Sequence, residues 1–162
     1  MLKNIVRAKV FLYGSEILSS SGIQQERLFI QHGTTSVLAH SFNVACISLL
    51  IVYFLRLRVN ERALVRGALL HDYFLYDWHK IKTKGLPHGF SHPRTALINA
   101  KRDFTIGEVE ENIISRHMFP LTAVPPKYKE SMVVCLADKI CAVTETFKMR
   151  RFIIGMNKNK SL

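Results

Sequence analysis

Cysteine is scarce in this chain, and the cysteines that it has form no motif. Cys46, Cys135 and Cys141 are odd in number and include no CxxC pair, which argues against a disulfide framework and against a CxxC zinc or redox site. Each lies in an apolar run, so we expect buried, reduced thiols. That state of the thiols is usual for a cytoplasmic protein, and we expect this location.

We expect no membrane-spanning helix, because the strongest continuous apolar run of the sequence is short. The strongest run extends from Phe42 to Leu55, whereas a membrane-spanning helix needs about 20 apolar residues. This run predicts a central core helix instead. Lys3 and Arg7 lie near the N-terminus, but no apolar core with a small-residue cleavage site follows them. We therefore expect no signal peptide.

Acidic residues are few, with 12 Asp and Glu against 23 Lys and Arg, and the formal net charge is +11. Such a charge favours partners that carry negative charge, which are phosphorylated metabolites, nucleic acid or an anionic membrane surface. The length predicts a single domain over residues 1–162. We expect its core to cover about 30–147 and a solvated basic tail to cover about 150–162.

Strand-like alternation and internal repeats are scarce too, and the apolar spacing is helical nearly throughout. The sequence therefore predicts an all-α fold of five or more helices. We expect helices over about 2–18, from a turn at 33–36 to about Arg58, over 61–78 after an Asn60 cap, from Pro93 to about Phe104, from a Thr105–Glu108 capping box through His117, and over about 128–150. Residues 79–91 are polar and read as a loop.

Ligand-type side chains lie inside these apolar stretches, where a polar group is costly unless something compensates it. They are His40, His71, Asp72, His88, His92, His117 and Asp138. Taken singly, each histidine is more simply a hydrogen-bonded core residue, and each aspartate an ion-pair partner or a helix cap. One shared divalent cation explains the burial of the whole set more simply than a separate explanation for each residue, because His and Asp are usual ligands of such ions.

The adjacent pair His71-Asp72 has a specific geometry. Neighbours on a helix point about 100° apart, and one ion between them can still accept both side chains. A carboxylate has two oxygens, so Asp72 can also reach a second ion on its far side. The expected arrangement places His40, His71, Asp72 and Asp138 around one ion, and His92, His117 and the shared Asp72 around another.

The order H…HD…D resembles the HD-domain superfamily of metal-dependent phosphohydrolases. The matching segments are Ser36–Ser41 around His40, Leu69–Asp72, and Cys135–Lys139 around Asp138. Two further segments resemble the added ligands of its binuclear branch, and they are Ser91–Ala96 and Arg116–Met118. The resemblance implies an all-α HD-domain bundle and metal-ligand roles for His40, His71, Asp72, His92, His117 and Asp138. It implies two divalent ions, and this ligand set does not distinguish Mn, Fe, Co, Ni, Zn or Mg.

The resemblance further implies hydrolysis of a phosphate ester or anhydride in a nucleotide or related metabolite, by a metal-bridged hydroxide that Asp72 orients. Leu75 and the lack of a GYP segment count against a cyclic dinucleotide. His88 is expected to support the second ion or to contact substrate. Candidate substrate-binding cations lie in or beside the loop, and they are Arg94, Lys80, Lys82 and Lys84. Asp77 either caps this loop or hydrogen-bonds a ligand histidine from behind.

Two other functions remain open at this point. The same ligands would serve a di-iron oxygenase of the HD type, which would consume oxygen. The chain could also be a non-enzymatic basic helical module that binds nucleic acid or an acidic partner, although no helix carries repeated basic residues on one face. Metal analysis of the purified protein would separate an enzyme from such a module. The sequence leaves the oligomeric state undetermined.

Overall fold

The computed structural model describes residues 2–80 and 87–146, and this part of the chain is mostly helical. Its elements are α1 (Leu2–Leu18), α2 (Ser21–Gln25), β1 (Ile30–His32), β2 (Thr35–Ser36), α3 (Val37–Phe54), α4 (Glu61–Leu70), α5 (His88–Asp103), α6 (Glu108–Arg116) and α7 (Lys129–Thr146). The predicted all-α fold is confirmed. The expected limits of the first helix are confirmed as well, whereas the expected end of the last helix near 150 lies outside the described residues.

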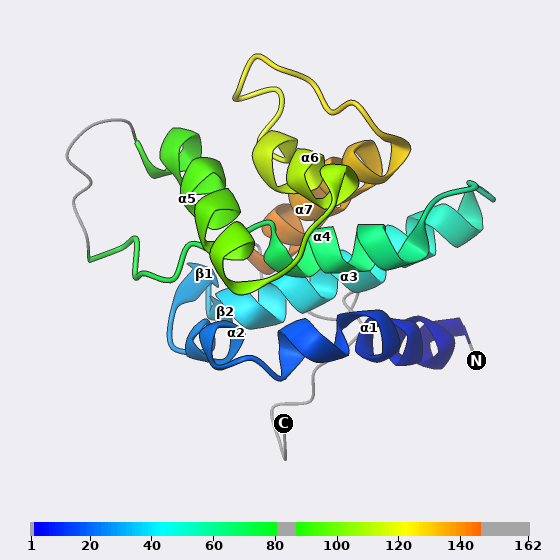
Figure 1. Ribbon diagram of the computed structural model, residues 1–162, viewed down its shortest axis with the longest axis horizontal. Helices are drawn as coiled ribbons and strands as arrows, with labels where there is room; N and C mark the ends of the chain where they lie inside the picture. Colours follow the sequence, from blue (N-terminus) through cyan, green and yellow to red (C-terminus); the bar gives the residue numbers. More distant parts are fainter. Residues whose placement is uncertain (1, 81–86, 147–162) are drawn as a thin grey trace.

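Helices α3 and α4 lie at the centre of the bundle (Figure 1). Helices α1 and α2 cover them on one side, α6 and α7 cover them on the other, and α5 stands at the end where α4 finishes. The apolar side chains of these helices form one buried cluster. The ends of several helices therefore meet near α5, and this is where the ligand-type residues lie.

Helix α3 is buried on nearly all sides and contains no charged residue. It begins at Ser36, whose hydroxyl accepts a hydrogen bond from Ala39 N–H at 3.3 Å. It ends at Phe54, which is earlier than the expected Arg58, because Arg56 adopts φ 52°. The N–H groups of Arg56 and Leu57 then donate to carbonyls of the last turn, which is a Schellman ending with arginine in place of the usual glycine.

By length and composition α3 is apolar enough to cross a membrane, and 67% of it is buried inside the protein. The central helix of a bundle meets the same description. Its position between α4 and α7 accounts for its composition without a membrane.

Helix α4 begins at the expected Asn60 cap, whose side chain accepts from Ala63 N–H at 3.0 Å. The expectation that it runs to about 78 is wrong, because it ends at Leu70. The following chain turns away, with Leu75 at φ 61°. The side-chain amide of Asn99 in α5 donates to the carbonyls of Tyr73 and Phe74 at 3.1 and 3.2 Å. The chain beyond α4 thus obtains its hydrogen bonds from a neighbouring helix rather than from its own next turn.

Two helix starts also differ from expectation. Helix α5 begins at His88, so that Pro93 lies inside the helix rather than in its first turn. The expected loop over 79–91 is therefore shorter, and its residues 81–86 lie outside the described residues. Helix α6 begins after Gly107, and Glu110 accepts from the Gly107 N–H at 2.9 Å. The expected capping box of Thr105 and Glu108 is wrong, because the helix begins two residues later.

A small hairpin precedes α3 and was not expected from the sequence. Strands β1 and β2 pair antiparallel, and Gly33 between them has φ 58°, a left-handed conformation that suits glycine. The pairing is too short to show alternation in the sequence. Its effect is to bring Gln31 and His32 to the ligand-type residues.

Candidate metal centre

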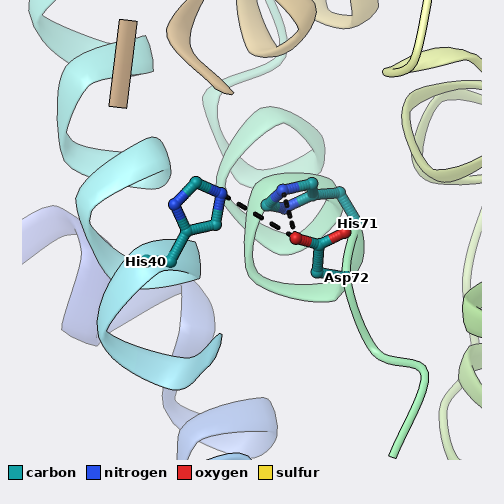
Figure 2. Close-up of side chains that lie close together, drawn as sticks. All are labelled: His40, His71 and Asp72. Atoms are coloured by element: carbon teal, nitrogen blue, oxygen red, sulfur yellow. Dashed lines mark ion pairs between the residues drawn. The ribbon is translucent and has the colours of Figure 1, made fainter. Parts of the chain in front are cut away.

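Six ligand-type residues come from five helices and meet inside the protein. They are His40 in α3, His71 and Asp72 at the C-terminal end of α4, His92 in α5, His117 at the C-terminal end of α6, and Asp138 in α7. All six are buried. Figure 2 shows the imidazoles of His40 and His71 pointing toward the carboxylate of Asp72. The convergence that the sequence predicts is therefore what the structure shows.

Four of these residues form what we call the first group, made of His40, His71, Asp72 and Asp138. His40 Nε2 lies 3.1 Å from Asp138 Oδ1 and 3.8 Å from Asp72 Oδ2. His71 Nε2 lies 3.3 Å from Asp72 Oδ2 and 3.6 Å from Asp138 Oδ1. Ligand atoms about 2.0–2.2 Å from one ion lie roughly 3–3.5 Å from one another. The spacing of the first group fits a single cation.

The second group consists of His92, His117 and the same Asp72. His92 Nε2 lies 2.8 Å from His117 Nε2 and 3.2 Å from Asp72 Oδ1, and His117 Nε2 lies 3.6 Å from Asp72 Oδ1. Asp72 thus turns Oδ2 toward the first group and Oδ1 toward the second. This division of one carboxylate between two groups is what the sequence predicts.

Backbone carbonyls fix the tautomer of three of the histidines. Nδ1 of His71, His92 and His117 lies 2.8, 2.8 and 2.9 Å from the carbonyl oxygens of Ala68, His88 and Ile114 respectively. A carbonyl oxygen only accepts, so each Nδ1 carries a hydrogen. In the neutral form of each ring, Nε2 then carries no hydrogen, and its lone pair is directed into the cluster.

These lone pairs and carboxylate oxygens face one another without enough donors. His71 Nε2 and Asp72 Oδ1 have no hydrogen-bond partner among the described residues, and the Nε2 atoms of His92 and His117 approach to 2.8 Å. Such a set of buried acceptors repels itself unless positive charge compensates it. Nitrogen and carboxylate donors with these spacings fit divalent transition metals or magnesium.

The electrostatics of the cluster agree with this reading. Burial opposes the charged form of His40, but its hydrogen bonds to Asp138 and Glu145 outweigh burial and raise its pKa to about 9. Burial raises the pKa of Asp72, yet the charge of His71 and the close approach of the His71 and His92 rings hold it well below its usual range. Burial lowers the pKa of His117 to about 3, and the charges of His71 and His92 add to this. Positive charge is thus favoured at His40, beside Asp138 and Glu145, and disfavoured at His117.

Glu145, which the sequence reasoning missed, lies behind His40. Its Oε2 is 2.9 Å from His40 Nδ1, and its Oε1 accepts from Asn43 Nδ2 at 3.0 Å. The signal for it was present, because Glu145 follows Asp138 by seven residues and therefore shares its face of the helix. Asn43 follows His40 by three residues and shares a face in the same way.

The hairpin and α2 bring three further unpredicted residues close to the cluster. Gln31 donates from Nε2 to Asp72 Oδ2 at 2.5 Å. His32, in the hairpin, lies with its ring 5.2 Å from that of His40. Glu26 is fully buried, and burial followed by the charge of Asp72 raises its pKa well above the usual range. No spacing in the sequence links these residues to the ligands.

The cluster of six ligand-type residues opens into a cavity of about 820 Å³. Its wall is mostly apolar and aromatic, with Trp78, Met118, Pro120, Leu121 and Ala142 among the lining residues. His88 lines it too, and its ring stacks between those of Trp78 and His92, with centroids 4.9 and 4.6 Å away. Lys139 is the cation on the wall among the described residues, and its Nζ donates to the carbonyl of His117 at 2.8 Å.

The remaining expected residues lie elsewhere or outside the described part of the chain. Arg94 and Lys80 are exposed and do not line the cavity. Asp77 pairs with Lys80 at 3.1 Å and accepts from His79 N–H at 3.1 Å, so it caps the turn and contacts no ligand histidine in the described structure. Lys82 and Lys84 lie outside the described residues.

A family model described as HD domain matches residues 37–143. These limits run from the start of α3 to near the end of α7 and include all six ligand-type residues. No curated protein and no solved structure matches the chain.

Proposed function

The chain belongs to the HD-domain family, and on this basis we propose that it is a metal-dependent phosphohydrolase. We propose that it cleaves a phosphate ester or anhydride of a nucleotide or a related phosphorylated metabolite. The observation that carries this proposal is the position of Asp72, whose two oxygens face two separate groups of buried histidines beside one cavity.

Each group would hold one divalent ion in this proposal. The first ion would be held by His40, His71, Asp72 Oδ2 and Asp138, and the second by His92, His117 and Asp72 Oδ1. Bound divalent ions supply Lewis acidity toward phosphoryl oxygens and lower the pKa of water in contact with them. The protein supplies fixed lone pairs, because the backbone carbonyls hold the rings of His71, His92 and His117 in one tautomer.

His88 is suited to give a hydrogen bond to the leaving oxygen. Burial lowers its pKa to about 4, and the charge of His92 adds to this, so the ring is neutral near pH 7. Its Nδ1 lies 3.0 Å from the hydroxyl of Tyr76, whose pKa burial raises. A Tyr76 hydroxyl that donates to Nδ1 places the ring hydrogen on Nε2, which has no partner among the described residues.

The cavity suits a substrate with one phosphorylated end and a less polar body. A volume of about 820 Å³ lies in the range of roughly 300–1,000 Å³ that small-molecule sites occupy. Trp78 and Leu121 on its wall favour a planar or apolar group. Lys139, which flanks the ligand Asp138 and lines the cavity, can offset phosphate charge.

The test is a screen of phosphorylated metabolites with metal-stripped protein and added Mn²⁺, Co²⁺ or Fe²⁺. We expect ion-dependent release of phosphate, and we expect Asp72→Asn to abolish both turnover and ion binding. Glu111→Gln is the matched control, because Glu111 pairs with Lys101 at 2.7 Å on the surface, away from the cavity. An Asp72→Asn protein with full turnover would contradict the proposal. Oxygen consumption by iron-loaded protein without phosphatase activity would favour an oxygenase instead.

A further inference from the structure

The ligand histidines are not all held in the same way. His71, His92 and His117 donate from Nδ1 to backbone carbonyls, whereas His40 faces the carboxylate of Glu145 at 2.9 Å. A carboxylate behind a ligand histidine adds a full negative charge and makes the ring a stronger donor to an ion, while a carbonyl adds only a dipole. His40 is therefore the most strongly assisted of the four rings.

Glu145 is itself fixed in place. It is 4% exposed, and each of its oxygens faces an N–H group, Oε2 that of His40 and Oε1 that of Asn43 at 3.0 Å. Because both oxygens accept, the side chain suits the ionised form. The contact joins α3 to α7.

The two groups consequently differ in negative charge. The first group has two imidazoles and the two carboxylates of Asp72 and Asp138, with Glu145 directly behind. The second group has two imidazoles and only the other oxygen of Asp72 among the described residues. A divalent cation is attracted more strongly where more negative charge surrounds it.

We propose that the two ion positions are unequal, and that Glu145, acting through His40, makes the first group the position that fills first. Glu145 is a positioning residue in this proposal, because it touches His40 and would not touch the ion. The inference rests on the metal centre of the proposed function and on no particular substrate.

The experiment is calorimetric titration of the full, metal-stripped chain with Mn²⁺. We expect two separate binding steps for the natural protein. Glu145→Gln keeps the shape and can still accept from His40. The Asn43 amide, whose Oδ1 has no partner within residues 2–80 and 87–146, can turn to accept from the new amide. We expect this variant to weaken the first step by about 10- to 100-fold and to leave the second step within about twofold.

Glu130→Gln is the matched control, because it removes the same charge from the same helix at the opposite end, where Glu130 accepts from Asn60 N–H. It should leave both steps unchanged. Glu145→Leu removes the acceptor as well as the charge and should weaken the first step further than Glu145→Gln. Nitrogen NMR of the His40 ring in the metal-free proteins checks the cause, because Glu145→Gln should keep the hydrogen on Nδ1 and Glu145→Leu should release it.

Two results would overturn the inference. One is a first step of natural strength in Glu145→Gln, and the other is an equal loss in both steps, which would place the effect in the fold. The natural protein alone also gives a test. Two Mn²⁺ binding steps of equal affinity would refute the inference that the positions are unequal, but would leave the proposed function standing. Absence of any ion binding would instead refute the proposed function.

Discussion

Binding of the first ion should release protons, because the ion and a proton compete for His40. In the metal-free protein His40 lies between Asp138 and Glu145, which raise its pKa to about 9 against the opposing effect of burial. Near pH 7 the ring is then protonated on both nitrogens, and the ion must displace the hydrogen on Nε2. Two pH units correspond to a cost of about 2.7 kcal/mol, which is roughly a hundredfold in affinity.

The pH dependence follows with a definite sign. Below the pKa of His40 the apparent affinity for the first ion should rise about tenfold for each pH unit, for each proton displaced. His71 adds to this, since burial is outweighed by the charge of Asp72 and the nearby carboxylate of Asp138, which raise its pKa. Calorimetry from about pH 6 to 8, in buffers with different ionisation enthalpies, measures both the slope and the number of protons released.

The control is Glu145→Gln, in which the pKa of His40 should fall and the proton release should diminish. Ion binding still weakens in this variant, because an ion brings two charges where the proton brings one. An affinity that stays constant from about pH 6 to 8, with no proton released, would refute the reasoning.

Three further outcomes are expected. In the metal-free protein His40 should stabilise the fold by about 3 kcal/mol; this stabilisation should be complete below about pH 6.5 and lost as the pH rises through about 9. The stabilisation from Asp72 should be present above about pH 4 and lost in acid. Measuring the free energy of unfolding in urea across this pH range checks both. Gly67→Val should cost about 1–3 kcal/mol, because a Cβ on Gly67 would overlap Ile113 Cδ1; an unchanged urea midpoint would contradict this. Ions at about a hundred times their dissociation constant should stabilise the fold by about 2.7 kcal/mol per site, so a chelator that leaves the melting temperature unchanged would argue against ion binding.

The helical class and the set of converging residues could be predicted from the sequence, because both follow from local patterns. Helical spacing placed the apolar faces, and the caps at Ser36 and Asn60 use side chains that are visible in the sequence. The sharing of Asp72 between two groups could be predicted because a carboxylate has two oxygens.

The ends of the helices could not be predicted in the same way. Arg56 and Leu75 adopt positive φ values, and neither residue type signals that conformation. Helix α4 stops before the expected position partly because Asn99, far along the chain, takes the carbonyls that follow it. A contact made only in the folded state leaves no local mark in the sequence.

The cations expected near the substrate show another limit. Arg94 was chosen for its closeness in sequence to His92, but neighbours on a helix point in different directions, and Arg94 is exposed. Lys139, the neighbour of Asp138 in the chain, lines the cavity. Sequence proximity to a ligand is therefore a poor guide to the direction of a long side chain.

The sharing of Asp72 between the two groups also limits how this site can diverge in evolution. In the proposed two-ion centre, a descendant that lost His117 would keep the whole set of His40, His71, Asp72 and Asp138, and with it the first ion position. A descendant that lost Asp72 would lose a donor from both halves at once. Selection can therefore relax at the histidines of the second group one codon at a time, whereas Asp72 allows no intermediate form.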